Sequence, residues 1–164
     1  MIWAILHDAV FAAIAGMGFG ALSNPPIKAF PYIALLAASG HAFRFVLMNY
    51  LGVDIALASL AASMLIGFGG LWLGYIACFP ITVVSIPALL PMVPGKLAYN
   101  TVFSIIMFLQ TMEDPEEHSR YMYMFIDNGI LSLTVIFFLA IGVIVPIALF
   151  PKIAYTLTRR QHKY

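Results

Sequence analysis

The stretch Ile55–Cys78, which reads IALASLAASMLIGFGGLWLGYIAC, decides the fold class of this chain. It contains no charged residue. An α-helix needs roughly 20 apolar residues to cross a hydrocarbon core of about 30 Å, and this segment is long enough to do so. The segment therefore predicts a transmembrane helix.

The composition of the whole chain agrees with this interpretation. Of its 164 residues, 63% are hydrophobic and 9% are charged. An ordinary soluble domain has about 45–50% apolar and about 25% charged residues. Too few polar side chains are present to cover a water-facing surface, which excludes a soluble fold, a disordered chain and a nucleic-acid-binding protein. We expect an all-α integral membrane protein.

Other apolar segments complete the predicted topology. Three of them are long enough to cross the bilayer: residues 2–22, 30–50 and 125–150. Residues 81–110 are too long for one straight span, and a Pro/Gly-rich segment at 87–95 breaks them. The prediction is a single transmembrane domain over residues 1–164 with about five transmembrane helices, the fourth of them broken. Four crossings with a re-entrant loop are the alternative.

The distribution of charge predicts the orientation. With five crossings, one side of the membrane receives most of the basic residues: Lys28, Lys152, Arg159, Arg160 and Lys163. The other side receives Asp54 and the acidic segment 113–120. Because cytoplasmic loops are enriched in lysine and arginine, we expect a cytoplasmic C-terminus and an N-terminus outside. The acidic segment is expected to be a solvated loop, with a gate or partner contact as the alternative.

Two charged or proton-active residues lie inside the second predicted span. His41 and Arg44 are three residues apart and therefore share a helical face. A buried arginine is costly in lipid, so Arg44 should face a partner, a cavity or a ligand. One interpretation is a structural pair with Asp8 or Asp127; the other is substrate or proton handling, with Asp8 also on the pathway. Asp127 and Asn128 are otherwise expected to cap the last span.

The segment Ile86–Lys96 is expected to end one half-helix and start another. It contains Pro87, Pro91, Pro94, Gly95 and Lys96. Broken helices form substrate sites in transporters, because a half-helix N-terminus presents free N–H groups and a positive dipole end. Lys96, Tyr99 and Asn100 would add charge and hydrogen-bonding groups to an anion site, and we expect a positive φ at Gly95. A kinked helix in which Lys96 snorkels to the interface is the alternative.

Small residues follow a helical stripe along the third span. They are Ser59, Ser63, Gly67, Gly70 and Gly74. In lipid such a stripe lets helices approach closely, so we expect a helix-packing face. The single cysteine, Cys78, suggests no metal site. The sequence has no nucleotide-binding loop and no hydrolase motif, so we expect that the protein is not an enzyme and needs no cofactor.

Several short motifs, in this order, resemble the threonine/serine exporter family. They are Asn24-Pro25, Gly40-His41-x-x-Arg44, Ala62–Gly67, Pro91–Gly95 and Ala98-Tyr99. The chain is similar to the short YjjB-type small subunit, which corresponds to the C-terminal half of the fused exporter. In the family pattern, His41, Arg44, Pro91, Pro94 and Gly95 occupy landmark positions, whereas Lys96 and the acidic segment depart from it.

The resemblance implies a multi-pass protein of the bacterial inner (plasma) membrane that works with a larger, separately encoded exporter subunit. It implies export of threonine and serine, or of a dicarboxylate such as succinate, driven by the proton gradient. Lys96 would favour an anion. The expected partners are that subunit, a small-molecule substrate and membrane lipid, with a homo-oligomer possible and no nucleic acid. A non-transporting assembly subunit and a homo-oligomeric channel are the alternatives.

Overall fold

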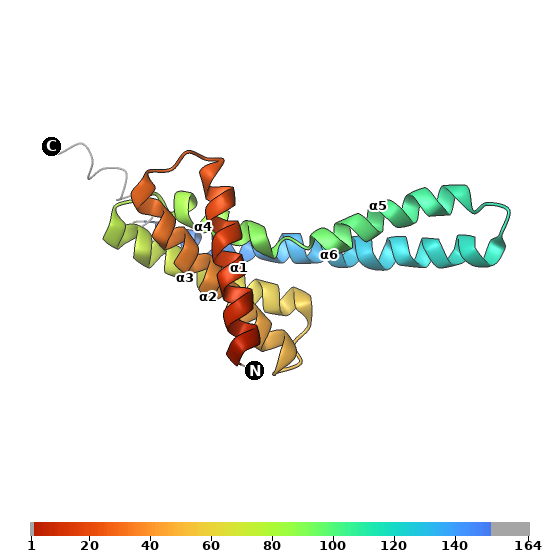
Figure 1. The fold of residues 1–164 in the computed structure, drawn as a ribbon, viewed down its shortest axis with the longest axis horizontal. Coiled ribbons are helices and arrows are strands. Elements are labelled where there is room, and N and C mark those ends of the chain that lie inside the picture. Colours follow the sequence, from red (N-terminus) through yellow and green to blue (C-terminus); the bar gives the residue numbers. More distant parts are fainter. Residues whose placement is uncertain (1, 152–164) are drawn as a thin grey trace. The chain divides into compact units, whose positions relative to one another are not determined.

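The computed structural model describes residues 2–151, and within that range it contains helices and no strands. The elements in chain order are α1 (Ile2–Ala21), η1 (Ile27–Ala29), α2 (Phe30–Asn49), α3 (Ile55–Ala77), α4 (Ile81–Leu89), η2 (Leu90–Met92), α5 (Gly95–Gln110) and α6 (Pro115–Leu149) (Figure 1). The predicted all-α fold is confirmed. The four basic residues of the tail lie outside the described residues.

Four helical segments are long and apolar enough to cross a membrane. They are Ile2–Ala21, Ile27–Asn49, Ile55–Ala77 and Pro115–Leu149. A fifth span results if Ile81–Met92 and Gly95–Gln110 count as one broken span. The chain is a multi-pass membrane protein with four to five candidate spans. Helix α6 has 35 residues and is about 52 Å long, so it exceeds the hydrocarbon core of about 30 Å.

The described chain divides into two compact units. One, which we call the bundle, comprises residues 2–92 and 138–151; the other, the hairpin, comprises Val93–Phe137. Helix α6 contributes to both units. The single transmembrane domain expected from the sequence stays a prediction.

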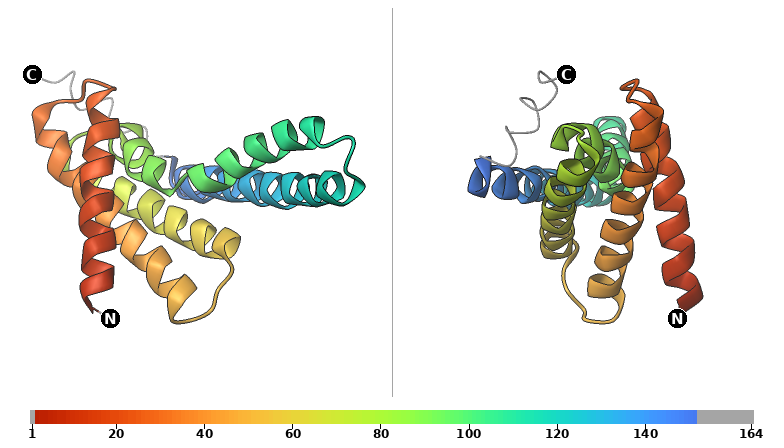
Figure 2. Two further views of the ribbon diagram at one scale, coloured as in Figure 1. Left: turned by 45° about the vertical axis from the view of Figure 1, so that its right-hand side comes forward. Right: turned by 90° about the vertical axis from the view of Figure 1, so that its left-hand side faces the viewer.

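In the bundle, α1 and α2 lie side by side, and α4 packs against α1, α2 and α3 (Figure 2). Glycines on α1 permit the close approach of its neighbours. A Cβ on Gly16 would lie 2.8 Å from Cβ of Ala37, and one on Gly20 would lie 2.9 Å from Cδ1 of Ile33. These distances are shorter than van der Waals contact, so larger residues there would push α1 and α2 apart.

The stripe of small residues on α3 is buried, and most of it meets other elements of the bundle. The one O–H of Ser63 is shared between the carbonyls of Leu60 (2.8 Å) and Phe138 (3.2 Å). A Cβ on Gly67 would lie 2.8 Å from Cγ of Pro146 in α6, and one on Gly70 would overlap Oγ of Ser85 in α4. A Cβ on Gly74 would lie 2.9 Å from the carbonyl of Phe79. The small side chains thus place α3 in contact with α4 and with the C-terminal part of α6.

The acidic segment differs from its expected form. The connection between α5 and α6 is short, and most of the segment belongs to α6, which begins at Pro115. Asp114 caps this helix, because its Oδ1 accepts the backbone N–H groups of Glu116 (3.1 Å) and Glu117 (3.3 Å). A capping aspartate followed by proline and glutamates is a strong helix start, so the expectation of a solvated loop over 113–120 was wrong.

Because α6 starts so early, Asp127 and Asn128 lie inside the helix. Asn128 donates from Nδ2 to the carbonyl of Met124 at 2.7 Å. Asp127 is exposed. The expectation that these two residues cap the last span was therefore wrong.

Candidate functional site

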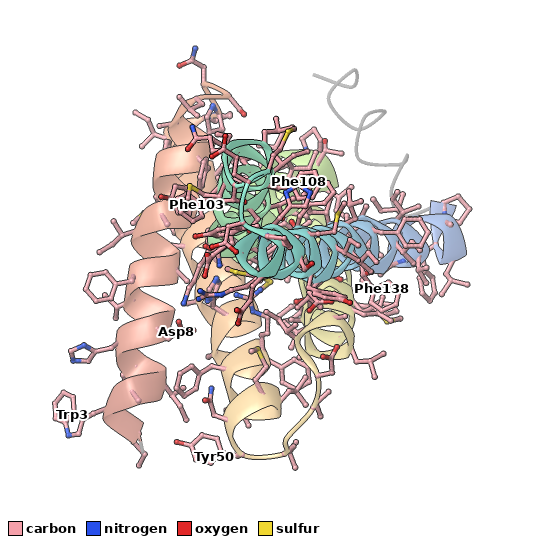
Figure 3. The ribbon with its side chains drawn as sticks, turned by 90° about the vertical axis from the view of Figure 1, so that its right-hand side faces the viewer. Trp3, Asp8, Tyr50, Phe103, Phe108 and Phe138 are labelled. Atoms are coloured by element: carbon pink, nitrogen blue, oxygen red, sulfur yellow. The ribbon has the colours of Figure 1, made fainter. Side chains whose placement is uncertain are left out.

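Polar groups from four elements meet inside the bundle. Asp8 comes from α1, His41 and Arg44 from α2, Ser59 from α3, and the main-chain carbonyl of Met92 from η2. Figure 3 shows Asp8 on the side of α1 that faces α2, whereas Trp3 projects away from it. We call these groups the polar cluster.

Asp8 and His41 form a close pair. Nδ1 of His41 lies 3.0 Å from Oδ2 of Asp8, and the two side chains are 13% and 31% exposed. When Asp8 is ionised and the His41 ring is neutral, the single ring proton is on Nδ1, which donates a hydrogen bond to the carboxylate. Nε2 of His41 is then a bare acceptor, and it is buried without a hydrogen-bond partner among the described residues. The pair therefore keeps one unused basic nitrogen within the membrane-spanning part of the chain.

Arg44 binds a main-chain carbonyl. Its Nη1 donates to the carbonyl of Met92 at 2.9 Å and to Oγ of Ser59 at 3.5 Å. The last carbonyls of a helix lack partners within the helix and carry partial negative charge, so a guanidinium is a suitable cap. The structural pair with Asp8 or Asp127 is absent from the hydrogen bonds and ion pairs of the described residues.

Gly40 explains how Arg44 reaches Met92. A Cβ on Gly40 would lie 2.7 Å from Cγ1 of Ile66 and 2.8 Å from Cε of Met92. Both neighbours are fully buried. The absent side chain lets η2 and α3 approach α2, one turn before Arg44. In the motif Gly40-His41-x-x-Arg44, the glycine thus lets η2 pack closely against α2, and the arginine caps the C-terminal end of η2.

The interruption after Met92 is narrower than expected. Pro87 lies inside α4 and Pro91 inside η2, so neither ends the helical segment. The chain turns at Pro94, which has φ −78° and ψ 71°, with the N–H of Gly95 donating to the carbonyl of Val93 at 2.8 Å. These values describe an inverse γ-turn.

Gly95 is the first residue of α5, and Gly52 is the described glycine with positive φ. The expectation of a positive φ at Gly95 was therefore wrong. Proline, with φ fixed near this value, supplies the turn that we had expected from glycine.

The three remaining residues of the expected anion site lie on α5, in the hairpin. Lys96 is exposed, and Tyr99 is 67% exposed with its ring stacked on Phe103 at 6.1 Å. Asn100 is half-buried. The polar cluster belongs to the bundle, so an anion site formed by Lys96, Tyr99 and Asn100 stays a prediction.

Two partners of Arg44 were missed in the sequence. The carbonyl of Met92 has no signature in the sequence, because every residue carries one. Ser59 was expected to pack, and it is fully buried, but its hydroxyl also contacts Arg44. A polar side chain at the start of an otherwise apolar span was the available signal.

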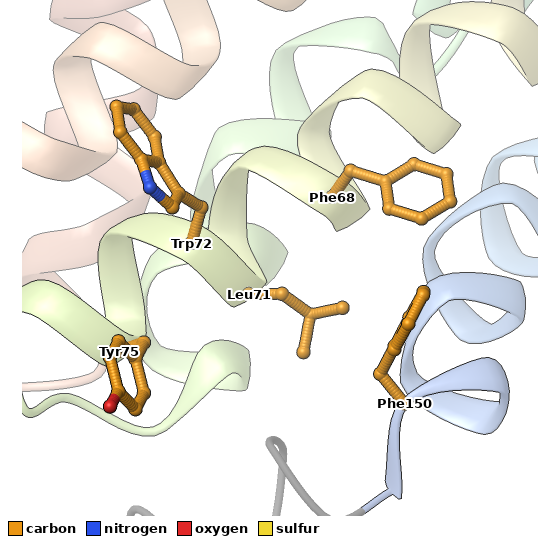
Figure 4. A pocket seen from close by; sticks show the side chains of 5 residues that line it. All are labelled: Phe68, Leu71, Trp72, Tyr75 and Phe150. Carbon is orange, nitrogen blue, oxygen red and sulfur yellow. The ribbon is translucent and has the colours of Figure 1, made fainter.

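The cavities of the bundle differ in chemical character. One of about 380 Å³ is lined by Phe68, Leu71, Trp72, Tyr75 and Phe150, with Phe68 and Phe150 in edge contact (Figure 4). None of these five lining residues is charged. Another, of about 550 Å³, is lined by Trp3, Ala4, His7, Asp8, Phe11 and Phe45. Asp8 thus lines an open cavity beside the polar cluster. Within residues 2–151, no group of three metal-ligating side chains occurs.

Fold and site together define the class: a multi-pass, all-helical membrane protein with an interrupted helix and a charged cluster within its spans. The family model described as "Threonine/Serine exporter, ThrE" matches residues 8–149. The chain belongs to this threonine/serine exporter family.

A relative from Haemophilus influenzae, described as an uncharacterized protein, is 36% identical over 102 residues, which cover 62% of this chain. The match spans 34% of the relative's length. No solved structure matches the chain.

Proposed function

We propose that this chain is the small subunit of a two-component secondary exporter of small polar metabolites, either threonine and serine or a dicarboxylate such as succinate. The observation that carries the proposal is the polar cluster. Ionisable groups in membrane spans are costly and mark substrate or ion pathways by default. Membership of an exporter family supports the same interpretation.

The Asp8–His41 pair gives the proposal a proton carrier. Histidine changes charge near neutral pH, and Nε2 of His41 is the unused basic position. A proton bound there creates a buried N–H that needs an acceptor, because an unpaired buried donor costs about 1–3 kcal/mol. Water or a substrate group must therefore approach when the pair is charged. This requirement would link proton uptake to a change at the site, as export driven by the proton gradient needs.

The remaining parts of the proposal concern partner and place. The resemblance of the chain to the short small subunit of the family supports a larger subunit of the same family as partner. We place the chain in the bacterial inner membrane with its C-terminus in the cytoplasm and its N-terminus outside. Lys96, in this proposal, favours dicarboxylates.

Efflux from cells tests the proposal. Cells that lack their own exporters are loaded with threonine or succinate and express this chain, the larger subunit, both or neither. We expect rapid efflux only with both. Efflux from this chain alone would instead indicate a homo-oligomeric channel. Equal efflux with and without the chain, at equal amounts of the larger subunit, would contradict the proposal and leave an assembly role.

A further inference from the structure

Among the described residues, one nitrogen of the Arg44 guanidinium makes all of its hydrogen bonds. A guanidinium has five N–H donors, and the two hydrogen bonds of Arg44 within residues 2–151, to the carbonyl of Met92 and to Oγ of Ser59, both use Nη1. Nε and Nη2 have no hydrogen-bond partner within residues 2–151. Neither is among the buried unpaired polar atoms of the described residues, so both keep some accessible surface.

The open edge has the geometry that carboxylates prefer. Nε–H and one Nη2–H point in parallel from the same side of a planar group, and they match the two oxygens of a carboxylate. The contacts on Nη1 come from two different elements, α3 and η2. Because the guanidinium is planar, anchoring one nitrogen at two points restricts the orientation of the free edge.

The nearest acidic side chain of the cluster is already engaged. Asp8 is bound by His41 at 3.0 Å, and no hydrogen bond joins it to Arg44 among the described residues. The aspartate therefore occupies none of the donors of the arginine. An incoming carboxylate therefore meets a cation whose bidentate edge is free.

We propose that the Nε–Nη2 edge of Arg44 binds the carboxylate group of the transported substrate, and that Ser59 and the carbonyl of Met92 position the guanidinium for it. Ser59 and Met92 are positioning groups, since they contact Arg44 on the other side. The inference rests on the proposed function for the identity of the ligand as a transported substrate. Met92 is the last residue before the helix is interrupted, so the site lies next to this interruption.

Binding to the full-length chain in lipid nanodiscs tests the proposal. The probes are succinate and its neutral diamide, and threonine and its amide, measured by calorimetry. We expect each acid to bind and the uncharged succinamide to bind at least about tenfold more weakly, because the fork loses its anionic partner. Arg44→Lys should weaken the binding of succinate at least about tenfold, since an ammonium cannot bind a carboxylate in the same bidentate way.

Serine variants separate positioning from packing. Ser59→Ala should weaken the binding of succinate about three- to tenfold, because Arg44 loses one of the hydrogen bonds that orient it. Ser63→Ala is the matched control. Ser63 is equally buried on the same helix, but it bonds to Leu60 and Phe138, so the affinity should stay unchanged. The midpoint of thermal unfolding, recorded for each variant, shows whether the fold is retained.

The outcomes are distinct. Wild-type affinity in folded Arg44→Ala, equal binding of succinate and succinamide, or no binding of either acid by the wild-type chain would each overturn the proposal. Equal weakening by Ser59→Ala and Ser63→Ala would overturn the positioning role. If efflux continues but binding does not depend on Arg44, this site is refuted and the exporter function stands. Binding that depends on Arg44 in a chain that adds nothing to efflux would refute the exporter function and leave the site intact.

Discussion

At the scale of single residues, the cluster depends on Gly40 as much as on charged side chains. Arg44 reaches the carbonyl of Met92 only because η2 lies close to α2, and Gly40 provides the space. Glycine weakens a helix, so its presence beside a buried arginine indicates a steric requirement. The positions of the charges could be predicted from the sequence. Their partners could not, since a main-chain carbonyl has no residue identity.

Gly40→Ala should destabilise the protein. The added Cβ would overlap Ile66 and Met92, and overpacking of this kind costs about 1–3 kcal/mol. Gly18→Ala is the control, because a Cβ on Gly18 meets nothing within 4 Å. Helix propensity should make that change neutral or stabilising by about 0.5–1 kcal/mol. Thermal unfolding in detergent measures both; an equal effect of the two substitutions would contradict the packing account.

Asp8→Asn should uncouple transport from the proton gradient. The amide oxygen can still accept the N–H of His41, but the negative charge is lost. We expect exchange of labelled for unlabelled substrate to continue in membrane vesicles, while export driven by a pH gradient falls at least about tenfold, because the pair no longer provides a charged proton acceptor. Gradient-driven export that persists at the wild-type rate would remove Asp8 from the proton pathway.

At the scale of elements, apolar length placed three segments, 2–22, 30–50 and 55–78, where the structure has the helices α1, α2 and α3. The start of α6 was not predicted, because a dense group of like charges is typical of a solvated loop. The capping signal Asp114-Pro115-Glu116-Glu117 nevertheless starts a helix there. The sequence predicted the turn after η2 at the right place. It assigned the unusual backbone conformation to Gly95, whereas Pro94 adopts it. Proline and glycine both mark turns, and the sequence alone does not say which of two neighbours adopts the unusual dihedral angles.

A pair of glycine substitutions tests this assignment. Gly95→Ala should leave export and stability unchanged or slightly improved, since the residue begins a helix, lacks positive φ and has open space around it. Gly52→Ala should cost about 1–2 kcal/mol, because Gly52 has φ 65° and an added Cβ is strained there. Unfolding midpoints compare the two. A larger loss at Gly95 than at Gly52 would contradict the γ-turn at Pro94.

At the scale of the whole molecule, the distribution of charge predicts the orientation in the membrane. A cysteine at Ser119, in a variant with the exposed Cys78 replaced by alanine, should react with a membrane-impermeant thiol reagent in intact cells. A cysteine at Thr158, in the predicted cytoplasmic tail, should react only after the cells are opened. Reaction at Thr158 and protection at Ser119 in intact cells would invert the topology.

If the polar cluster binds the transported substrate, replacement of Arg44 tests its role most directly. Efflux of threonine and succinate should be measured from cells that co-express the larger subunit with wild-type chain, Arg44→Ala or Arg120→Ala, at equal membrane levels. Arg120 is a matched arginine outside the cluster, 65% exposed and paired with Glu117. We expect Arg44→Ala to abolish export of both substrates while the subunits still co-purify, and Arg120→Ala to export normally. Normal export by Arg44→Ala, or loss of the complex in place of loss of flux, would contradict the account.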